Sequence, residues 1–97
     1  MYQNVLLVDL SSGGYTYKTV KARPRGRAVV RSDGEEVVHY VVLFEGENGM
    51  YYTQEILCFP YPFRAFFFSS SFESFEDAFL TLSALDNALK RSDFELQ

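Results

Sequence analysis

Residues 37–59 read VVHYVVLFEGENGMYYTQEILCF, and this stretch decides the fold. β-Branched and aromatic residues, which favour extended strands, fill both sides of Asn48-Gly49. Asn-Gly is a strong hairpin signal, because both central residues of a type I′ turn need positive φ. The stretch therefore predicts two antiparallel strands, over 36–45 and 50–59.

Turn signals continue on both sides of this hairpin. Ser11–Gly14 predicts a turn and Asp33-Gly34 a second hairpin, whereas Pro60 and Pro62 lack the N–H that a strand ladder needs. Between these signals lie further runs of β-branched and aromatic residues. We expect four more strands, over 2–10, 15–23, 27–32 and 63–69.

The segment around Pro24 admits two interpretations, a turn or a bulge inside one long strand. If Asp33-Gly34 closes a hairpin, Val30 faces Val37 and Ala28 faces His39. The strand over 36–45 then reaches back past Pro24. We therefore prefer one strand through 15–32, bent or bulged at Pro24–Gly26.

The last third of the chain has a helical period. Ser74 is a good N-cap, Glu76 and Asp77 suit the first turn, and Lys90 and Arg91 suit the last. The apolar residues spaced by three and four are Phe75, Ala78, Phe79, Leu82, Leu85 and Leu89. This pattern predicts a helix over 74–91 and a tail over 92–97, held by Phe94 and Leu96.

Together these elements predict an α+β fold in a single domain over 1–97. Its sheet is an antiparallel meander of five to six strands, bent or shaped as a half-barrel. One C-terminal helix packs on one face of the sheet. The 47% hydrophobic and 18% aromatic content supplies a core and argues against disorder.

The strands over 36–69 are apolar on both faces, although an antiparallel sheet with one wet face alternates. One helix about 10 Å across cannot cover both faces of a sheet roughly 24 Å wide. The second face must curl into a half-barrel, pair with another copy or receive another protein. We expect a homodimer or a partner-binding face here. The residues expected to form it are Tyr40, Val42, Phe44, Tyr51, Tyr52, Tyr61 and Phe66.

Charge is strongly uneven along the chain. Six of the nine Lys and Arg residues lie between 18 and 31, and twelve of the thirteen acids follow residue 32. This basic segment, with Tyr15 and Tyr17 nearby, could follow a nucleic-acid backbone or an acidic protein. Alternatively, its charges meet acids on neighbouring strands. The residues concerned are Lys18, Lys21, Arg23, Arg25, Arg27 and Arg31.

The sequence offers little for catalysis. His39, the sole histidine, lies between valines, and Cys58, the sole cysteine, stands beside Phe59. A catalytic thiol needs a base partner, and a metal needs several ligands at suitable spacing. We therefore expect a structural histidine, an inert thiol, no catalytic residues, no metal and no cofactor.

The first ten residues lack the basic start of a secretion signal, and no apolar run approaches the length that spans a bilayer. We expect a cytoplasmic protein without a membrane segment. In size and in its lack of catalytic residues, the chain resembles small inhibitors carried by phages and mobile elements, such as anti-CRISPR proteins. That resemblance implies a non-catalytic protein-binding module, an inhibitor or adaptor. The alternatives are a nucleic-acid-binding protein and, last, a small enzyme.

Overall fold

The computed structural model describes residues 1–32, 37–60, 62–90 and 94–96, with side chains described over 1–27, 37–60 and 62–83. The predicted Asp33-Gly34 turn, Tyr61 and Arg91 lie outside the described residues. The elements are β1 (Gln3–Ser11), β2 (Gly14–Ser32), β3 (Val38–Gly46), β4 (Tyr51–Pro60), β5 (Phe63–Phe72), α1 (Phe75–Lys90) and β6 (Phe94–Leu96).

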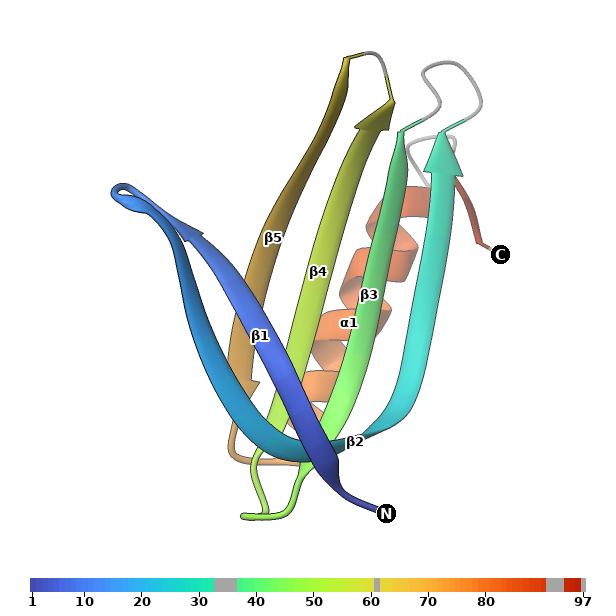
Figure 1. Cartoon of the computed structure of the whole chain (residues 1–97). Coiled ribbons are helices and arrows are strands. Elements are labelled where there is room, and N and C mark those ends of the chain that lie inside the picture. Colours follow the sequence, from blue (N-terminus) through green and yellow to red (C-terminus); the bar gives the residue numbers. More distant parts are fainter. Residues whose placement is uncertain (33–36, 61, 91–93, 97) are drawn as a thin grey trace.

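The sheet confirms the predicted fold class. Its strands follow the order β1-β2-β3-β4-β5 with antiparallel pairing throughout, which is a meander, and α1 follows it (Figure 1). One expectation was wrong, because the predicted tail contains β6, a short strand that pairs with Val30–Ser32 of β2. β5 also continues to Phe72 instead of ending at 69, since Ser69–Ser71 still pair with β4.

β2 is one long strand with a bulge, as predicted. Pro24 pairs with Phe44 and Gly26 with Leu43, so Arg25 is the extra residue. The bulge bends β2 so that its first half pairs with β1 and its second half with β3.

Two predicted hairpin details were wrong. Val30 pairs with His39, not Val37, because β2 and β3 are joined by more than a two-residue turn; this shift of two keeps each side chain on its predicted face. At the β3–β4 connection, the Gly46 amide bonds to the Met50 carbonyl, which leaves a three-residue loop. Gly49 ends that loop at φ 86°, as in a type I turn followed by a left-handed residue.

Different parts of the chain partly cover the two faces of the sheet. In Figure 1 the β1–β2 hairpin crosses in front of the lower part of β3–β5, and α1 lies behind them. We call these the hairpin face and the helix face. On the hairpin face, Leu7, Val20 and Ala22 of the hairpin pack with Tyr52 of β4 in one buried cluster. The half-barrel is therefore made by a folded-over hairpin, and it is not closed.

The helix begins where predicted. The Asp77 amide donates to the Ser74 hydroxyl, which confirms the N-cap. Ala78 of α1 is fully buried, and Val41, Leu43 and Thr53 on the helix face of the sheet are also buried. Phe75 and Phe79, predicted for the buried stripe, instead stack on each other and stay partly exposed.

Gln54 joins the folded hairpin to the sheet. Its side chain is only 7% exposed, and its Oε1 accepts from the Val8 amide at 2.7 Å while its Nε2 donates to the Val8 carbonyl at 2.9 Å. Nε2 also lies 2.9 Å from the Phe68 carbonyl of β5. Close by, the Asp9 carboxylate accepts from the Ser69 amide. Side chains thus form the seam between β1 and β5 that a closed barrel would form with backbone bonds.

We predict that Gln54→Leu lowers the free energy of unfolding by about 2–3 kcal/mol, because the outward backbone groups of Val8 lose both partners. Urea denaturation measures this loss. Gln3→Leu, at an exposed glutamine of the same hairpin, is the control and should change stability little. Equal stability of the two variants would contradict a structural role for the Gln54 amide.

Candidate protein-binding surface

The residues predicted to form a protein-binding face do not share one face. The pairing register places Tyr40, Val42, Phe44 and Tyr52 on the hairpin face. The remaining described members lie on the helix face; they are Tyr51 and Phe66.

Most of these side chains already have partners inside the molecule. Tyr52 is 4% exposed within the buried cluster, and Phe44 packs against it. Tyr51 meets the Phe75 ring edge-on with centroids 5.6 Å apart. Tyr40, at 39% exposed, is the most open of the described set. The folded hairpin therefore takes up much of the apolar surface that the sequence suggested for a partner.

A different apolar surface is more open. On β1 and β2 the side chains that alternate with the buried ones lie on the outer side of the hairpin, and they include Leu6 at 56% and Tyr17 at 67% exposed. Leu10 and Tyr15 face each other across the same two strands and are partly exposed. The Tyr15 side chain also reaches β5, where its ring meets Phe67 edge-on and its hydroxyl donates to the Ala65 carbonyl. Val8, opposite Tyr17, is half-buried between them. We call these residues the outer hairpin patch: Leu6, Val8, Leu10, Tyr15 and Tyr17.

The sequence contains a signal for this patch. Residues 5–8 read VLLV, so β1 is apolar on both of its faces, just like the central strands. Val5 and Leu7 point into the core, while Leu6 and Val8 point outward. Because the residues of β1 are apolar on both faces, as in the strands over 36–69, the sequence pattern indicates an apolar patch on the outer side of β1 as well.

The basic segment does not form a continuous stripe. Lys21 and Arg23 lie on the same side of β2, but the bulge turns Arg27 to the opposite side, next to Val42. The Lys18 ammonium lies 5.6 Å from the centre of the Tyr52 ring. Arg31 belongs to β2, but its side chain is outside the described set.

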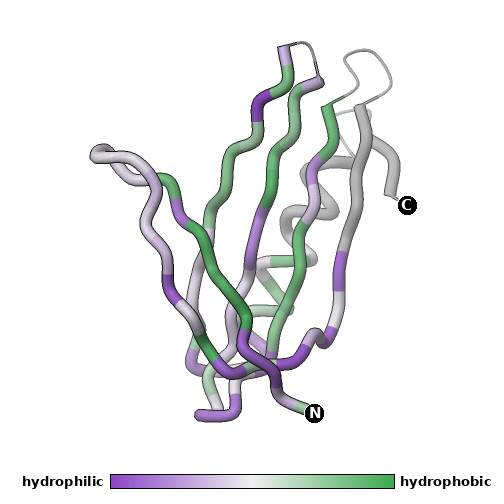
Figure 2. Tube along the Cα trace, in the orientation of Figure 1, coloured by the Kyte–Doolittle hydropathy of each residue, from purple (hydrophilic) through white to green (hydrophobic). Residues whose placement is uncertain are grey.

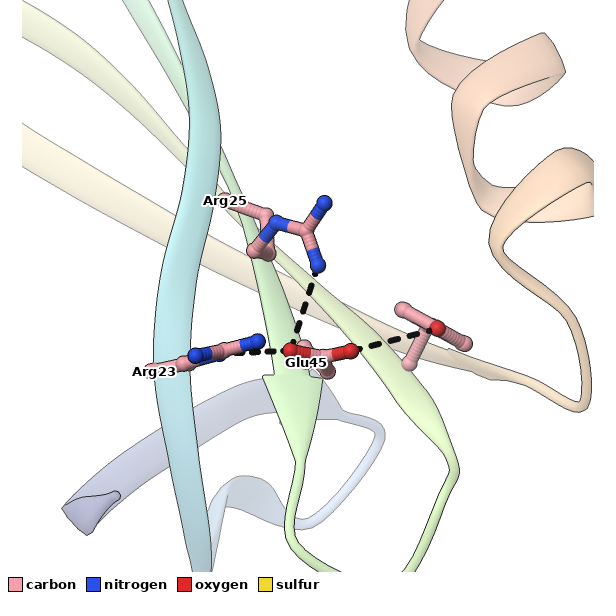
Figure 3. Close-up of polar contacts among 4 residues, drawn as sticks. Arg23, Arg25 and Glu45 are labelled. Carbon is pink, nitrogen blue, oxygen red and sulfur yellow. Dashed lines mark hydrogen bonds and ion pairs between the residues drawn. The ribbon is translucent and has the colours of Figure 1, made fainter. Parts of the chain in front are cut away.

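Two of the arginines are paired within the chain. Arg23 Nε lies 2.5 Å and Arg25 Nη1 3.2 Å from Glu45 Oε2, so both converge on one carboxylate (Figure 3). The hydrogen bond from Arg23 holds the pKa of the Glu45 carboxyl below its usual value; partial burial opposes this effect and Arg25 adds to it. The same pair raises the pKa of Arg23. These contacts match the alternative in which the basic charges meet acids on neighbouring strands.

A hollow opens where β2 bends toward the β3–β4 loop. It has a volume of about 470 Å³ and is lined by Lys18–Lys21 of β2, Glu47 and Asn48 of the loop, and Tyr52. Figure 2 shows hydrophilic residues gathered at this bend and loop. A smaller hollow of about 140 Å³ continues from it, because Lys18 and Tyr52 line both, and it reaches Ser69–Ser71.

The histidine and the cysteine are not brought together. His39 lies on the helix face, with Nε2 3.2 Å from Glu55 Oε1, whereas Cys58 belongs to the hairpin face. A Cys–His pair cannot form across the sheet. Within the residues that the structure describes, no three His, Cys, Asp or Glu side chains gather closely enough to hold a metal ion.

Comparison with protein-family models, curated proteins and solved structures finds no match to this chain. In the described part of the chain, α1 is the one helix, and it lacks the length and apolar character needed to cross a bilayer. The candidate surface therefore rests on the geometry of the chain itself.

The Glu45 cluster makes stability pH-dependent. Because the pKa of Glu45 is lower in the folded than in the unfolded protein, its contribution is complete above the unfolded value near about 4.3 and is lost as pH falls below it. We predict that stability falls more steeply between about pH 5 and pH 3 in the natural protein than in Glu45→Gln, which does not titrate. Urea midpoints across that range measure the difference. Glu73→Gln, at an exposed glutamate before α1, is the control and should keep the natural slope.

Proposed function

We propose that this chain is a non-catalytic protein-binding module, an inhibitor or adaptor of the cytoplasm, which contacts its partner through the outer hairpin patch. The observation that carries this proposal is the exposure of Leu6 and Tyr17, which lie next to Val8 on the outer side of the hairpin. Exposed apolar patches of this kind mark interaction sites. Tyrosine suits such a surface, because it offers a large apolar ring and a hydroxyl at a low cost in side-chain entropy.

A protein partner fits these observations better than a nucleic acid does. Arg23 and Arg25 are paired with Glu45, and Lys18 lies over Tyr52, so half of the basic segment already has contacts in the chain. The patch itself carries no charge. Nucleic-acid binding draws on cations that are available to phosphates, and it weakens steeply as salt rises. Apolar contact depends much less on salt.

The partner can be another protein or a second copy of this chain. Leu6, Leu10, Tyr15 and Tyr17 at their exposures offer roughly 400 Å² of apolar area. Each partner of a stable complex buries about 800 Å². Contact with a partner therefore has to extend beyond the patch, whichever partner binds.

The proposal is tested by photo-crosslinking in cells that express the chain. We predict that a benzoylphenylalanine at position 17 captures one discrete protein, and that Leu6→Asp, which places a charge in the patch, abolishes capture. The same group at position 76, exposed on α1, is the matched control and should not capture that protein.

Molar mass from light scattering, at low and high salt, separates self-association from binding of a different protein. A captured second copy with a dimeric mass identifies the partner as the chain itself. Nucleic acid captured at position 17, or no adduct that differs from the position 76 control, would overturn the proposal.

A further inference from the structure

One edge of the folded hairpin keeps its backbone groups available. The Val8 amide and carbonyl both bond to Gln54, so the backbone of Val8 points away from β2. Val8 faces Tyr17 in the register, and facing residues of an antiparallel pair either bond to each other or both point outward. The N–H and C=O of Tyr17 therefore point away from β1, and alternation extends this to Tyr15, Thr19 and Lys21.

Lys21 confirms the direction of this alternation. Its carbonyl accepts from the Glu47 amide of the β3–β4 loop at 2.8 Å, on the side of β2 opposite to β1. β2 pairs with β3 only from Ala22 onward. In the described part of the chain, no backbone hydrogen bond reaches the outward groups of Tyr17 or Thr19.

Nearby edges have some of their outward backbone groups occupied. On β5, the Tyr15 hydroxyl occupies the Ala65 carbonyl at 2.8 Å, and Asp9 occupies the Ser69 amide. On β1, Gln54 occupies the backbone of Val8. Beyond Ala22, the bulge at Arg25 breaks the regular spacing of β2. The edge of β2 over Tyr15–Thr19 is a regular strand edge, and the hollow lies beside its Lys18 and Thr19.

The hollow beside this edge carries more positive than negative side chains. The 470 Å³ hollow lies along Lys18–Lys21, and the side chains of Lys18 and Lys21 leave opposite faces of β2. Lys18 points to the sheet side, over Tyr52, and Lys21 to the outer side. Glu47 is the one acid that lines the hollow. A strand lying in this place would meet a positive side chain on each of its faces.

We propose that the edge of β2 over Tyr15–Thr19 is the docking site for an extended acidic segment of the partner protein, which adds to the sheet as a further strand beside β2. The inference rests on the proposed function and specifies how the partner binds. Main-chain hydrogen bonds supply affinity in this mode of recognition, and alternate side chains supply specificity. The added strand lies next to Tyr17, so it extends the outer hairpin patch and supplies contact area that the patch lacks.

The geometry also describes the segment. The outward groups of Tyr15, Tyr17 and Thr19 pair with about five residues of the segment, and about two further residues extend it to Lys21. Because Lys18 and Lys21 are three apart and on opposite faces, acids at an odd spacing, such as three residues, meet both. An apolar residue on the outer face, one position beyond the acid that meets Lys18, lies opposite Tyr17.

A displayed library of random twelve-residue peptides provides the probe. Selection on the whole protein should enrich acidic, β-branched sequences, and a synthetic copy of the most enriched peptide is then titrated by fluorescence anisotropy. Thr19→Pro removes an outward N–H without removing a β1–β2 bond, and should weaken binding by at least about tenfold. Thr19→Val keeps the N–H and should bind as the natural protein does.

Two further measurements keep the test independent of how Thr19→Pro folds. N-methylation of alternate amides of the peptide should abolish binding in one methylation frame and spare it in the other, because only one set of amides faces β2. In the protein, amide exchange at Tyr17 and Thr19 should slow when peptide binds, whereas Val20, which pairs with Val5, should already be protected.

Charge variants complete the test. Glu47→Gln should tighten peptide binding by about twofold to fivefold, and Lys21→Gln should weaken it by a similar factor. Selected peptides without acidic enrichment, or binding that ignores Thr19→Pro and methylation, would overturn the strand-addition proposal. A protein captured at position 17 together with such peptides would leave the proposed function standing, so the two failures are distinguishable.

Discussion

The four hydrogen bonds of one side-chain amide hold the two halves of this structure together. Gln54 donates to and accepts from the backbone of Val8, and it also reaches the carbonyls of Glu55 and Phe68. A primary amide offers the same donor and acceptor as a peptide unit, so it replaces the missing backbone ladder between β1 and β5. Without it, the hairpin would still pack through Leu7 and Val20, but the polar edge of β1 would face the apolar side of β4 unpaired.

The bend in β2 decides where that hairpin lies. A single strand serves two partners, β1 before Ala22 and β3 after it, and the bulge at Arg25 redirects the chain between them. The bend brings Arg23 and Arg25 close together, and Glu45 on the facing strand balances them. Part of the basic charge in this segment is therefore explained by the bend in β2, where Arg23 and Arg25 pair with Glu45. The bend also leaves Lys18 and Lys21 beside the hollow instead of along one stripe.

Local signals were enough to predict most of the fold. Asn48-Gly49 marked a hairpin, Pro24 marked the bulge, and Ser74 marked the start of the helix. The register of β2 against β3 was not predictable, because it depends on how many residues join the strands. The short strand β6 was missed because three paired residues leave no period to detect.

The candidate site was harder to predict than the fold. The strands over 36–69 were correctly recognised as apolar on both faces, but sequence alone does not say which part of the chain covers them. The hairpin covers Tyr52, and this moves the open apolar surface to Leu6 and Tyr17. The free edge of β2 follows from the direction of the Val8 backbone, and only a structure supplies that direction.

Strands joined by a side-chain amide tolerate fewer substitutions at the joining position than strands joined by backbone hydrogen bonds. Ladder bonds come from the backbone, so most residues can replace one another there without breaking them. At position 54, few other amino acids can make the same hydrogen bonds. Asparagine is one methylene shorter, glutamate lacks the donor when ionised, and lysine lacks an acceptor. Drift in the lineage of this protein is therefore expected to change the strands around Gln54 long before it changes Gln54 itself.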